Sequence, residues 1–223
     1  MDLKHSLFTL AVCCVSSTVS AASYVYKGAP YTLVQDFAGP CGEGPCANYV
    51  IGEKVTGQFT TAVPLAPNLS NQNILPSVTS YAFSDGVDTY SSADPNARVD
   101  DFVVSTDSNG NISAFDVMLI IWQTGTSPHA AGDRVARFAV SSSFEDLAEN
   151  DAPCVVIVTA PSGASDACVT FAPDGSTSLS EANTYGAFSI VTAPAPVPTL
   201  SGWAILSLFL FVAGIARLAL STV

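Results

Sequence analysis

Basic side chains are scarce in this chain. Its 223 residues include seven Lys and Arg but 19 Asp and Glu, which gives a formal net charge of −12. Outside the two end segments described below, five basic and 18 acidic side chains remain. Such a surface repels nucleic acid phosphates and anionic lipid head groups. The charge balance therefore indicates no nucleic acid partner, and it is compatible with divalent cations or cationic partners.

Histidine and tryptophan are also rare, which argues against several catalytic classes. His129 is the one histidine beyond the amino-terminal segment, and no Gly-x-Ser-x-Gly motif nominates a serine that it could activate. We therefore interpret His129 as a solvent-exposed loop residue. Trp122 follows an apolar run, which predicts a core position rather than an aromatic platform in a sugar-cleaving cleft. We expect no cofactor and no enzymatic activity.

Long apolar runs occur only towards the two ends of the sequence. Residues 1–22 have the features of a signal peptide, because Lys4 supplies a positive charge and Leu7 to Val15 form an apolar core. Small residues at Ala21 or Ala22 fit the end of the cleaved peptide. The apolar core is too short to span a bilayer stably. The sequence therefore predicts export.

The second apolar run lies near the carboxyl end. Residues 197–216 have the length of a membrane-spanning helix and contain no charge, and we place the helix at about 203–220. Trp203 lies where an interfacial aromatic residue would, and Arg217 can reach the opposite face of the membrane. A Pro- and Ala-rich linker at 193–198 precedes the helix. The predicted topology has the ectodomain outside and Arg217 inside.

A specific motif opens this carboxyl-terminal segment. It comprises Val197, Pro198, Thr199, Leu200, Ser201, Gly202 and Trp203. Together with the apolar helix and Arg217, this motif resembles the IPTL-CTERM sorting signal of Gram-negative bacteria, a relative of the PEP-CTERM signals that exosortases read. The resemblance covers residues 197–218, with Val for the usual Ile, Gly for the usual Glu, and a basic cluster reduced to one residue.

The resemblance implies a partner, a location and a processing step. The partner is an exosortase-type membrane sorting enzyme. The precursor would be anchored in the inner membrane and face the periplasm, and the product would reach the cell surface or the extracellular space. A plain single-span anchor needs no motif and is one alternative. A GPI signal is another, although Arg217 within the tail argues against it.

Four cysteines remain once the signal peptide has taken Cys13 and Cys14 with it. An even number in an exported chain predicts disulfides, and four cysteines allow three pairings. Metal binding would need converging thiolates, and these spacings are not of the paired Cys-x-x-Cys kind. We favour two local pairs that bracket Gly-, Pro- or Ser-rich loops, namely Cys41 with Cys46 and Cys154 with Cys168.

The segment 23–192 has the pattern of a single all-β domain, which we expect to be a β-sandwich or jelly-roll-like barrel. In Val55–Val63, the residues Val55, Phe59 and Val63 share one face with Gly57 and Thr61. A helix is indicated weakly at Ser143–Asn150. Further expected strands are Tyr31–Phe37, Ser77–Phe83, Asp101–Thr106, Ile112–Gln123, Val135–Ser141, Cys154–Ala160, Cys168–Ala172 and Ala187–Thr192.

Two groups of acidic residues are candidates for cation binding or salt bridges. Asp107, Asn109 and Asn111 could offer oxygens to Ca²⁺, but their spacing does not fit an EF-hand loop, and a hairpin closed by Asn109-Gly110 is the alternative. The second group is expected in a charged loop before a strand, with Arg98 as its salt-bridge partner. It comprises Asp94, Asp100 and Asp101.

The front half of the ectodomain also resembles, more loosely, the ectodomains often found ahead of such sorting signals. The resemblance covers residues 24–123, through short patterns at 24–28, 55–59, 83–86 and 105–112, and it implies no particular activity. We expect an exported, non-enzymatic protein of the cell surface or extracellular matrix, with extracellular polysaccharide as a candidate partner. The alternatives are a carbohydrate-binding or hydrolytic domain on a simple membrane anchor and a calcium-stabilised adhesion module.

Overall fold

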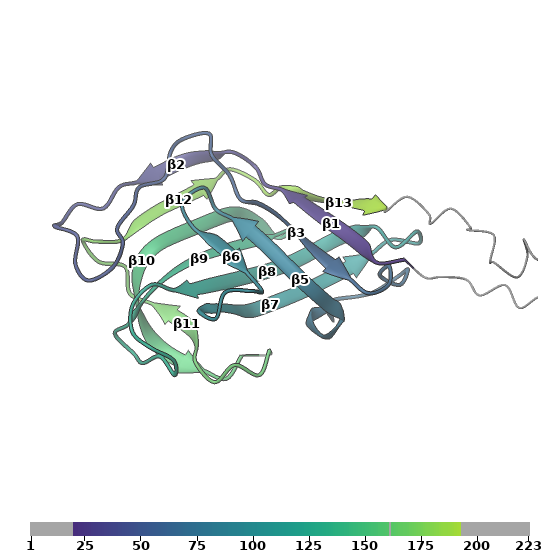
Figure 1. Ribbon diagram of the computed structural model, residues 1–223. Helices are drawn as coiled ribbons and strands as arrows, with labels where there is room; N and C mark the ends of the chain where they lie inside the picture. Colours follow the sequence, from purple (N-terminus) through teal and green to yellow (C-terminus); the bar gives the residue numbers. More distant parts are fainter. Residues whose placement is uncertain (1–19, 161, 193–223) are drawn as a thin grey trace, which may run out of the picture.

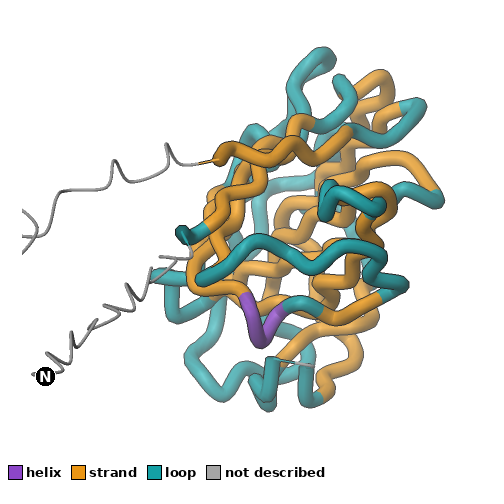
Figure 2. Tube along the Cα trace, turned by 90° about the vertical axis from the view of Figure 1, so that its right-hand side faces the viewer, coloured by secondary structure: helices purple, strands orange, loops and turns teal. Residues whose placement is uncertain are grey.

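The computed structural model describes residues 20–160 and 162–192 (Figure 1). The predicted signal peptide up to residue 19, the linker, the sorting motif, Arg217 and the membrane helix lie outside these residues. Within the described part, no helix has both the length and the apolar character needed to cross a membrane. A single 3₁₀ turn at Leu75–Ser77, purple in Figure 2, accompanies the strands.

The described chain is all β and forms two antiparallel sheets. Sheet A has the strand order β13-β1-β3-β5-β6, and sheet B has the order β2-β12-β10-β9-β8-β7-β4, with β11 paired to β10. The strands of sheet A are β1 (Ala22–Lys27), β3 (Thr56–Thr61), β5 (Val78–Ser84), β6 (Thr89–Ser91) and β13 (Ala187–Thr192). Those of sheet B are β2 (Tyr31–Gln35), β4 (Gln72–Asn73), β7 (Ala97–Thr106), β8 (Ile112–Trp122), β9 (Arg134–Ser141), β10 (Phe144–Val158), β11 (Ala167–Phe171) and β12 (Ser178–Ala182).

The two sheets face each other across an aromatic core. Phe59 of β3 stacks on Tyr24 of β1 with 4.8 Å between ring centroids, and it meets Phe102 of β7 edge-on at the same distance. Phe138 of β9 meets Tyr90 of β6 edge-on, also at 4.8 Å. Each of these rings is at most 1% exposed. Aromatic contacts between sheets A and B therefore supply much of the apolar burial that holds the fold together.

Buried aspartates connect this core to the surrounding loops through tyrosine hydroxyls. Asp85, in the β5–β6 turn, accepts hydrogen bonds from the hydroxyls of Tyr49 (3.0 Å) and Tyr90 (2.7 Å). Asp146 of β10 accepts one from Tyr26 of β1 at 2.6 Å. Burial raises the pKa of Asp85 to about 6. Neutral tyrosine hydroxyls therefore satisfy the hydrogen bonds of these buried carboxylates, and no Lys or Arg side chain is needed.

A second, smaller core lies on the opposite face of sheet B. Neighbouring residues of β8 alternate between the two cores, since Leu119 belongs to the aromatic core and Ile120 to the smaller one. The β10–β11 hairpin covers this face and carries the disulfide between Cys154 and Cys168. Trp122 is 3% exposed in the smaller core, so its predicted core position is confirmed.

The structure corrects two expectations about local structure. The weak helix expected at Ser143–Asn150 is wrong, because this segment belongs to β10 and pairs with both β9 and β12. Asp146, Ala148 and Asn150 are fully buried at every second position, and the two polar ones hide the strand pattern in the sequence. Val63 does not share the core face with Phe59, since it lies beyond the end of β3 and is 51% exposed.

The aromatic core predicts a large effect for one truncation. Phe59→Ala removes a fully buried ring that touches both sheets, and we expect it to lower the free energy of unfolding by about 3–5 kcal/mol. Val63→Ala is the control, because its side chain is half exposed, and its effect should stay within about 0.5 kcal/mol. Urea unfolding of the two variants measures both values, and similar midpoints would contradict the assignment of Phe59 to the core.

Candidate binding pocket

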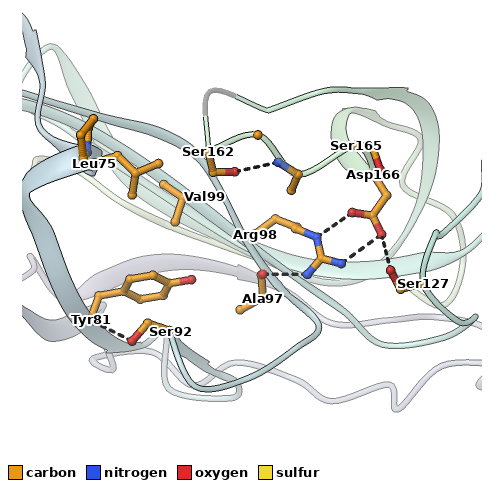
Figure 3. Close-up of a pocket in the computed structure, with 13 residues that line it drawn as sticks. Leu75, Tyr81, Ser92, Ala97, Arg98, Val99, Ser127, Ser162, Ser165 and Asp166 are labelled. Carbon is orange, nitrogen blue, oxygen red and sulfur yellow. Dashed lines mark hydrogen bonds and ion pairs between the residues drawn. The ribbon is translucent and has the colours of Figure 1, made fainter.

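A cavity of about 680 Å³ opens beside β7, between the end of β6 and the β10–β11 loop. Tyr81 of β5 contributes a half-buried ring, and Arg98 of β7 contributes its guanidinium group. Figure 3 shows Tyr81 and the Arg98–Asp166 pair lying on different sides of this space. Four exposed serines also line the cavity, beside apolar residues such as Leu75, Pro76 and Val99. These serines are Ser92, Ser127, Ser162 and Ser165.

Asp166 is the polar centre of the pocket. Its carboxylate accepts hydrogen bonds from Arg98 Nε at 2.7 Å and from Arg98 Nη2 at 3.0 Å, a bidentate ion pair (Figure 3). Ser127 Oγ donates a third at 3.3 Å. Hydrogen bonds from Arg98 and His129, together with the positive charge of Arg98, hold the pKa of Asp166 well below its usual range. The pocket therefore contains a charged pair whose carboxylate stays ionised at neutral pH.

His129 also binds the carboxylate of Asp166. Its Nδ1 lies 2.8 Å from Asp166 Oδ2, and its backbone N–H donates to the same oxygen at 3.2 Å. The imidazole stacks on Trp122 with 4.5 Å between ring centroids. The expectation of a solvent-exposed loop histidine is therefore wrong, because His129 is 6% exposed and packs between an acid and an indole.

The arrangement differs from that of a nucleophilic hydrolase. Ser127 and His129 both bind the carboxylate of Asp166, and no hydrogen bond joins Ser127 Oγ to the imidazole in the described part of the chain. A histidine that activates a serine needs that direct contact. Asp166 is a fixed carboxylate that three residues hold by hydrogen bonds, and such a group can orient a polar ligand.

The expected acidic cluster is arranged differently from the prediction. Arg98 forms its ion pair with Asp166, which is 68 residues away in the sequence, rather than with Asp94, Asp100 or Asp101. Asp100 lies within β7 and not in a loop before it, while Asp101 lies in the strand expected at Asp101–Thr106. Because Val99 pairs with Leu119 and Asp101 with Met118, Asp100 is the extra residue of a β-bulge.

Asp100 is a buried acid without a hydrogen-bond partner. The residue is 5% exposed, and neither carboxylate oxygen has a partner among the described residues. Burial and the neighbouring charge of Asp101 raise its pKa to about 7, although Arg137 opposes the shift. Ionising Asp100 therefore destabilises the folded protein.

The weak calcium candidates occupy a β-turn. Asp107 Oδ1 accepts hydrogen bonds from the backbone N–H groups of Asn109 (2.7 Å) and Asn111 (2.9 Å), and Oδ2 accepts one from the Asn111 side chain. Gly110 has a φ of +83°, and a glycine in this left-handed conformation is typical of a three-residue hairpin loop. The hairpin alternative is therefore confirmed, and β7 and β8 are the strands it joins.

Comparisons with known proteins bring no relative to this site. No family model matches the chain, and neither a curated protein nor a solved structure matches it. The interpretation of the pocket therefore rests on its own geometry. Sequence reasoning singled out Arg98 and His129 but missed Asp166, because nothing in its local sequence distinguishes it from the other loop aspartates. Tyr81 likewise had no recognisable signal.

The raised pKa of Asp100 predicts how stability depends on pH. The carboxyl group ionises near pH 4 in the unfolded chain and near pH 7 in the folded one, so stability falls as the pH rises through this window. Asp100→Asn removes the effect, and we expect it to stabilise the protein at pH 8 by up to about 4 kcal/mol relative to its effect at pH 4. Urea unfolding at both pH values measures this difference.

The matched control is Asp36→Asn, which changes an exposed carboxylate. Its stability should follow that of the unchanged protein at both pH values. If Asp100→Asn changed the free energy of unfolding by the same amount at pH 4 and at pH 8, the result would show that the carboxyl group of Asp100 does not titrate between these pH values.

Proposed function

We propose that this chain is an exported, non-enzymatic protein of the bacterial surface or extracellular matrix, held first in the membrane by its carboxyl-terminal helix and then processed by an exosortase-type enzyme. The proposal rests on the signal peptide features and on the sorting motif at Val197–Trp203, which resembles IPTL-CTERM. The acidic β domain is consistent with it. Its two facing sheets support assignment to the β-sandwich class.

The observation that supports the proposal most directly is the pairing of the first and last strands. Ala22 lies opposite Thr192 in the β1–β13 ladder, so the chain enters and leaves the domain at one point (Figure 1). Ala22 is the first residue of β1, so cleavage after Ala21 would leave β1 intact at the start of the mature chain. A tail after Thr192 would hold the domain by the same edge.

The disulfides support the exported location. The structure pairs Cys41 with Cys46 and Cys154 with Cys168, which is the local pairing that the sequence favours. Disulfides persist in oxidising compartments such as the periplasm and the cell exterior. Both are consistent with a periplasmic or extracellular domain.

Processing can be tested by intact mass. We expect the full-length protein, expressed with an exosortase of the matching type, to lose the segment beyond about Val197, and to keep it in a host without the enzyme. Pro198→Ala should block the loss because it changes the recognised motif, whereas Pro196→Ala in the linker should not. A product that keeps Trp203 to Val223 in both hosts would leave a simple membrane anchor.

A second candidate function is carbohydrate binding in the pocket. The observation that favours it is the combination of the Tyr81 ring, several exposed serine hydroxyls and the fixed Asp166 carboxylate in one cavity. Sugar rings pack on aromatic faces, and their hydroxyl groups exchange hydrogen bonds with such polar groups. A neutral polysaccharide would also avoid repulsion from the acidic surface.

Calorimetric titration with dextran and with cello-oligosaccharides tests this second function. We expect Tyr81→Ala to weaken binding about tenfold, because the lost ring contact is worth about 1–1.5 kcal/mol. Tyr185→Ala is the matched control, since Tyr185 is 46% exposed and does not line the pocket. Binding that both variants weaken equally, or that neither changes, would exclude the pocket as the site.

A further inference from the structure

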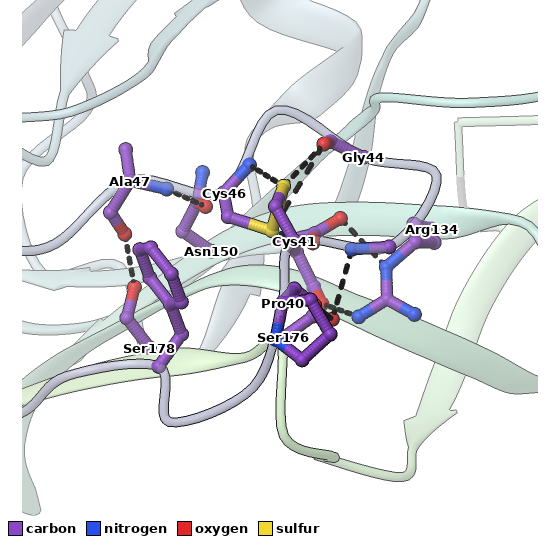
Figure 4. Close-up of a disulfide and its surroundings, with 12 residues drawn as sticks. Pro40, Cys41, Gly44, Cys46, Ala47, Arg134, Asn150, Ser176 and Ser178 are labelled. Atoms are coloured by element: carbon purple, nitrogen blue, oxygen red, sulfur yellow. Dashed lines mark hydrogen bonds and ion pairs between the residues drawn. A yellow bond between two sulfur atoms is a disulfide. The ribbon is translucent and has the colours of Figure 1, made fainter.

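A different site surrounds the disulfide between Cys41 and Cys46. Cys41 is exposed and Cys46 is half-buried (Figure 4). Both lie near Asp151, which is fully buried in β10. Cys46 Sγ is 2.8 Å from Asp151 Oδ2, and Cys41 Sγ is 3.0 Å from the carbonyl oxygen of Gly44. One ligand atom from each of Cys41, Cys46 and Asp151 lies within 4.8 Å of the others.

This disulfide differs from the other one because a buried carboxylate oxygen, Asp151 Oδ2, faces the sulfur of Cys46. A disulfide sulfur has no proton to donate to that oxygen. Among the described residues, Cys46 Sγ is the one polar partner of Asp151 Oδ2. A buried carboxylate oxygen normally has a donor or a cation as its partner. The oxidised site supplies neither to Oδ2.

The scaffold around the site is held independently of the disulfide. Arg134 Nε donates to Asp151 Oδ1 at 2.6 Å, which leaves Oδ2 directed at the sulfur atoms. On one side of the loop, Ala47 N–H donates to the Asn150 side chain at 3.0 Å (Figure 4). On the other side, Gly42 N–H donates to Ser176 Oγ at 3.2 Å. Opening the S–S bond would therefore leave both sulfur atoms near Asp151.

We propose that reduction of the Cys41–Cys46 disulfide creates a zinc site, with two thiolates and Asp151 Oδ2 as ligands and a fourth position open to water. A dithiol reductant supplies two electrons and two protons, so the S–S bond becomes two thiols while the reductant becomes a disulfide. Zn²⁺ then replaces the two thiol protons, which pass to the solvent. Two thiolates and one carboxylate form a ligand set that zinc accepts.

The charge balance is compatible with a divalent cation. Two thiolates, Asp151 and Asp174 carry four negative charges, while Arg134, which pairs with both carboxylates, carries one positive charge. Zn²⁺ replaces two thiol protons and brings two positive charges, so its binding leaves the net charge of the reduced site unchanged. The metal site is independent of the sorting signal and of carbohydrate binding.

The other disulfide provides an internal contrast. Cys154 and Cys168 are 1% and 0% exposed, and their sulfur atoms face the backbone carbonyls of Val156 and Thr170 at 3.5 and 3.3 Å. The group of potential metal ligands in the described residues is Cys41, Cys46 and Asp151, and it includes neither Cys154 nor Cys168. A reductant should therefore reach Cys41 first, and only the Cys41–Cys46 pair should gain metal affinity.

The test uses the full-length protein in detergent, treated with dithiothreitol under mild conditions and then desalted without oxygen. We expect Zn²⁺ titration to show one ion bound per reduced molecule and none per oxidised molecule. Asp151→Asn should weaken zinc binding at least about tenfold. Reduced protein that binds no zinc, or oxidised protein that binds it equally well, would overturn the proposal.

Two control variants separate the ligands from their neighbours. Asp174→Asn changes the other carboxylate that pairs with Arg134, at 2.8 and 3.0 Å, and it should leave zinc affinity unchanged. The double variant Cys41→Ser, Cys46→Ser keeps every other cysteine of the chain and should bind no zinc. Binding by this double variant equal to that of the unchanged protein would overturn the site.

A spectroscopic measurement covers the case in which Asp151→Asn does not fold. Co²⁺ in the reduced unchanged protein should show thiolate charge-transfer absorption together with the intense d–d bands of a tetrahedral ion. Weak octahedral d–d bands without thiolate charge transfer would overturn the proposed ligand set.

Discussion

The pairing of the first strand with the last is the constraint on which the rest of the structure depends. β1 lies between β13 and β3, so strands from both ends of the domain form one side of sheet A, with β13 at its edge. Tyr24 and Tyr26 of β1 are each 1% exposed and reach into the space between the sheets. Their hydroxyls also hold loops in place, since Tyr24 accepts from Leu65 N–H and Tyr26 donates to Asp146. Loss of β1 would therefore disturb both sheets.

The shortage of cations shapes the polar interior. The three arginines of the described chain each pair with a buried acid: Arg98 with Asp166, Arg134 with Asp151, and Arg137 with Glu149. Asp85 and Asp146 use tyrosine hydroxyls and backbone N–H groups instead. Unpaired buried charge costs several kcal/mol, so each remaining exception is informative. Among the described residues, Asp100 has no hydrogen-bond partner, and one oxygen of Asp151 faces sulfur.

The proposed pocket and the proposed metal site both depend on loops that β10 brings into place. The β10–β11 loop delivers Asp166 to Arg98 of β7, and the bulge of β10 after Glu149 presents Asp151, at a φ of +61°, to the Cys41–Cys46 loop. Such contacts join residues 68 and 105 positions apart. The same strand therefore serves the core with one part of its length and both candidate sites with others.

The sequence by itself determined the all-β class, most of the long strands and the Asn109-Gly110 hairpin, because apolar alternation and turn residues are local signals. It could not reveal β10 at Ser143–Asn150, since its inward-facing Asp146 and Asn150 read as polar. It could not find the Arg98–Asp166–His129 group or the approach of Asp151 to Cys46 either. Only the tertiary structure decided these contacts. Their partners are distant in sequence and are brought together by burial and charge, so no short sequence pattern predicts them.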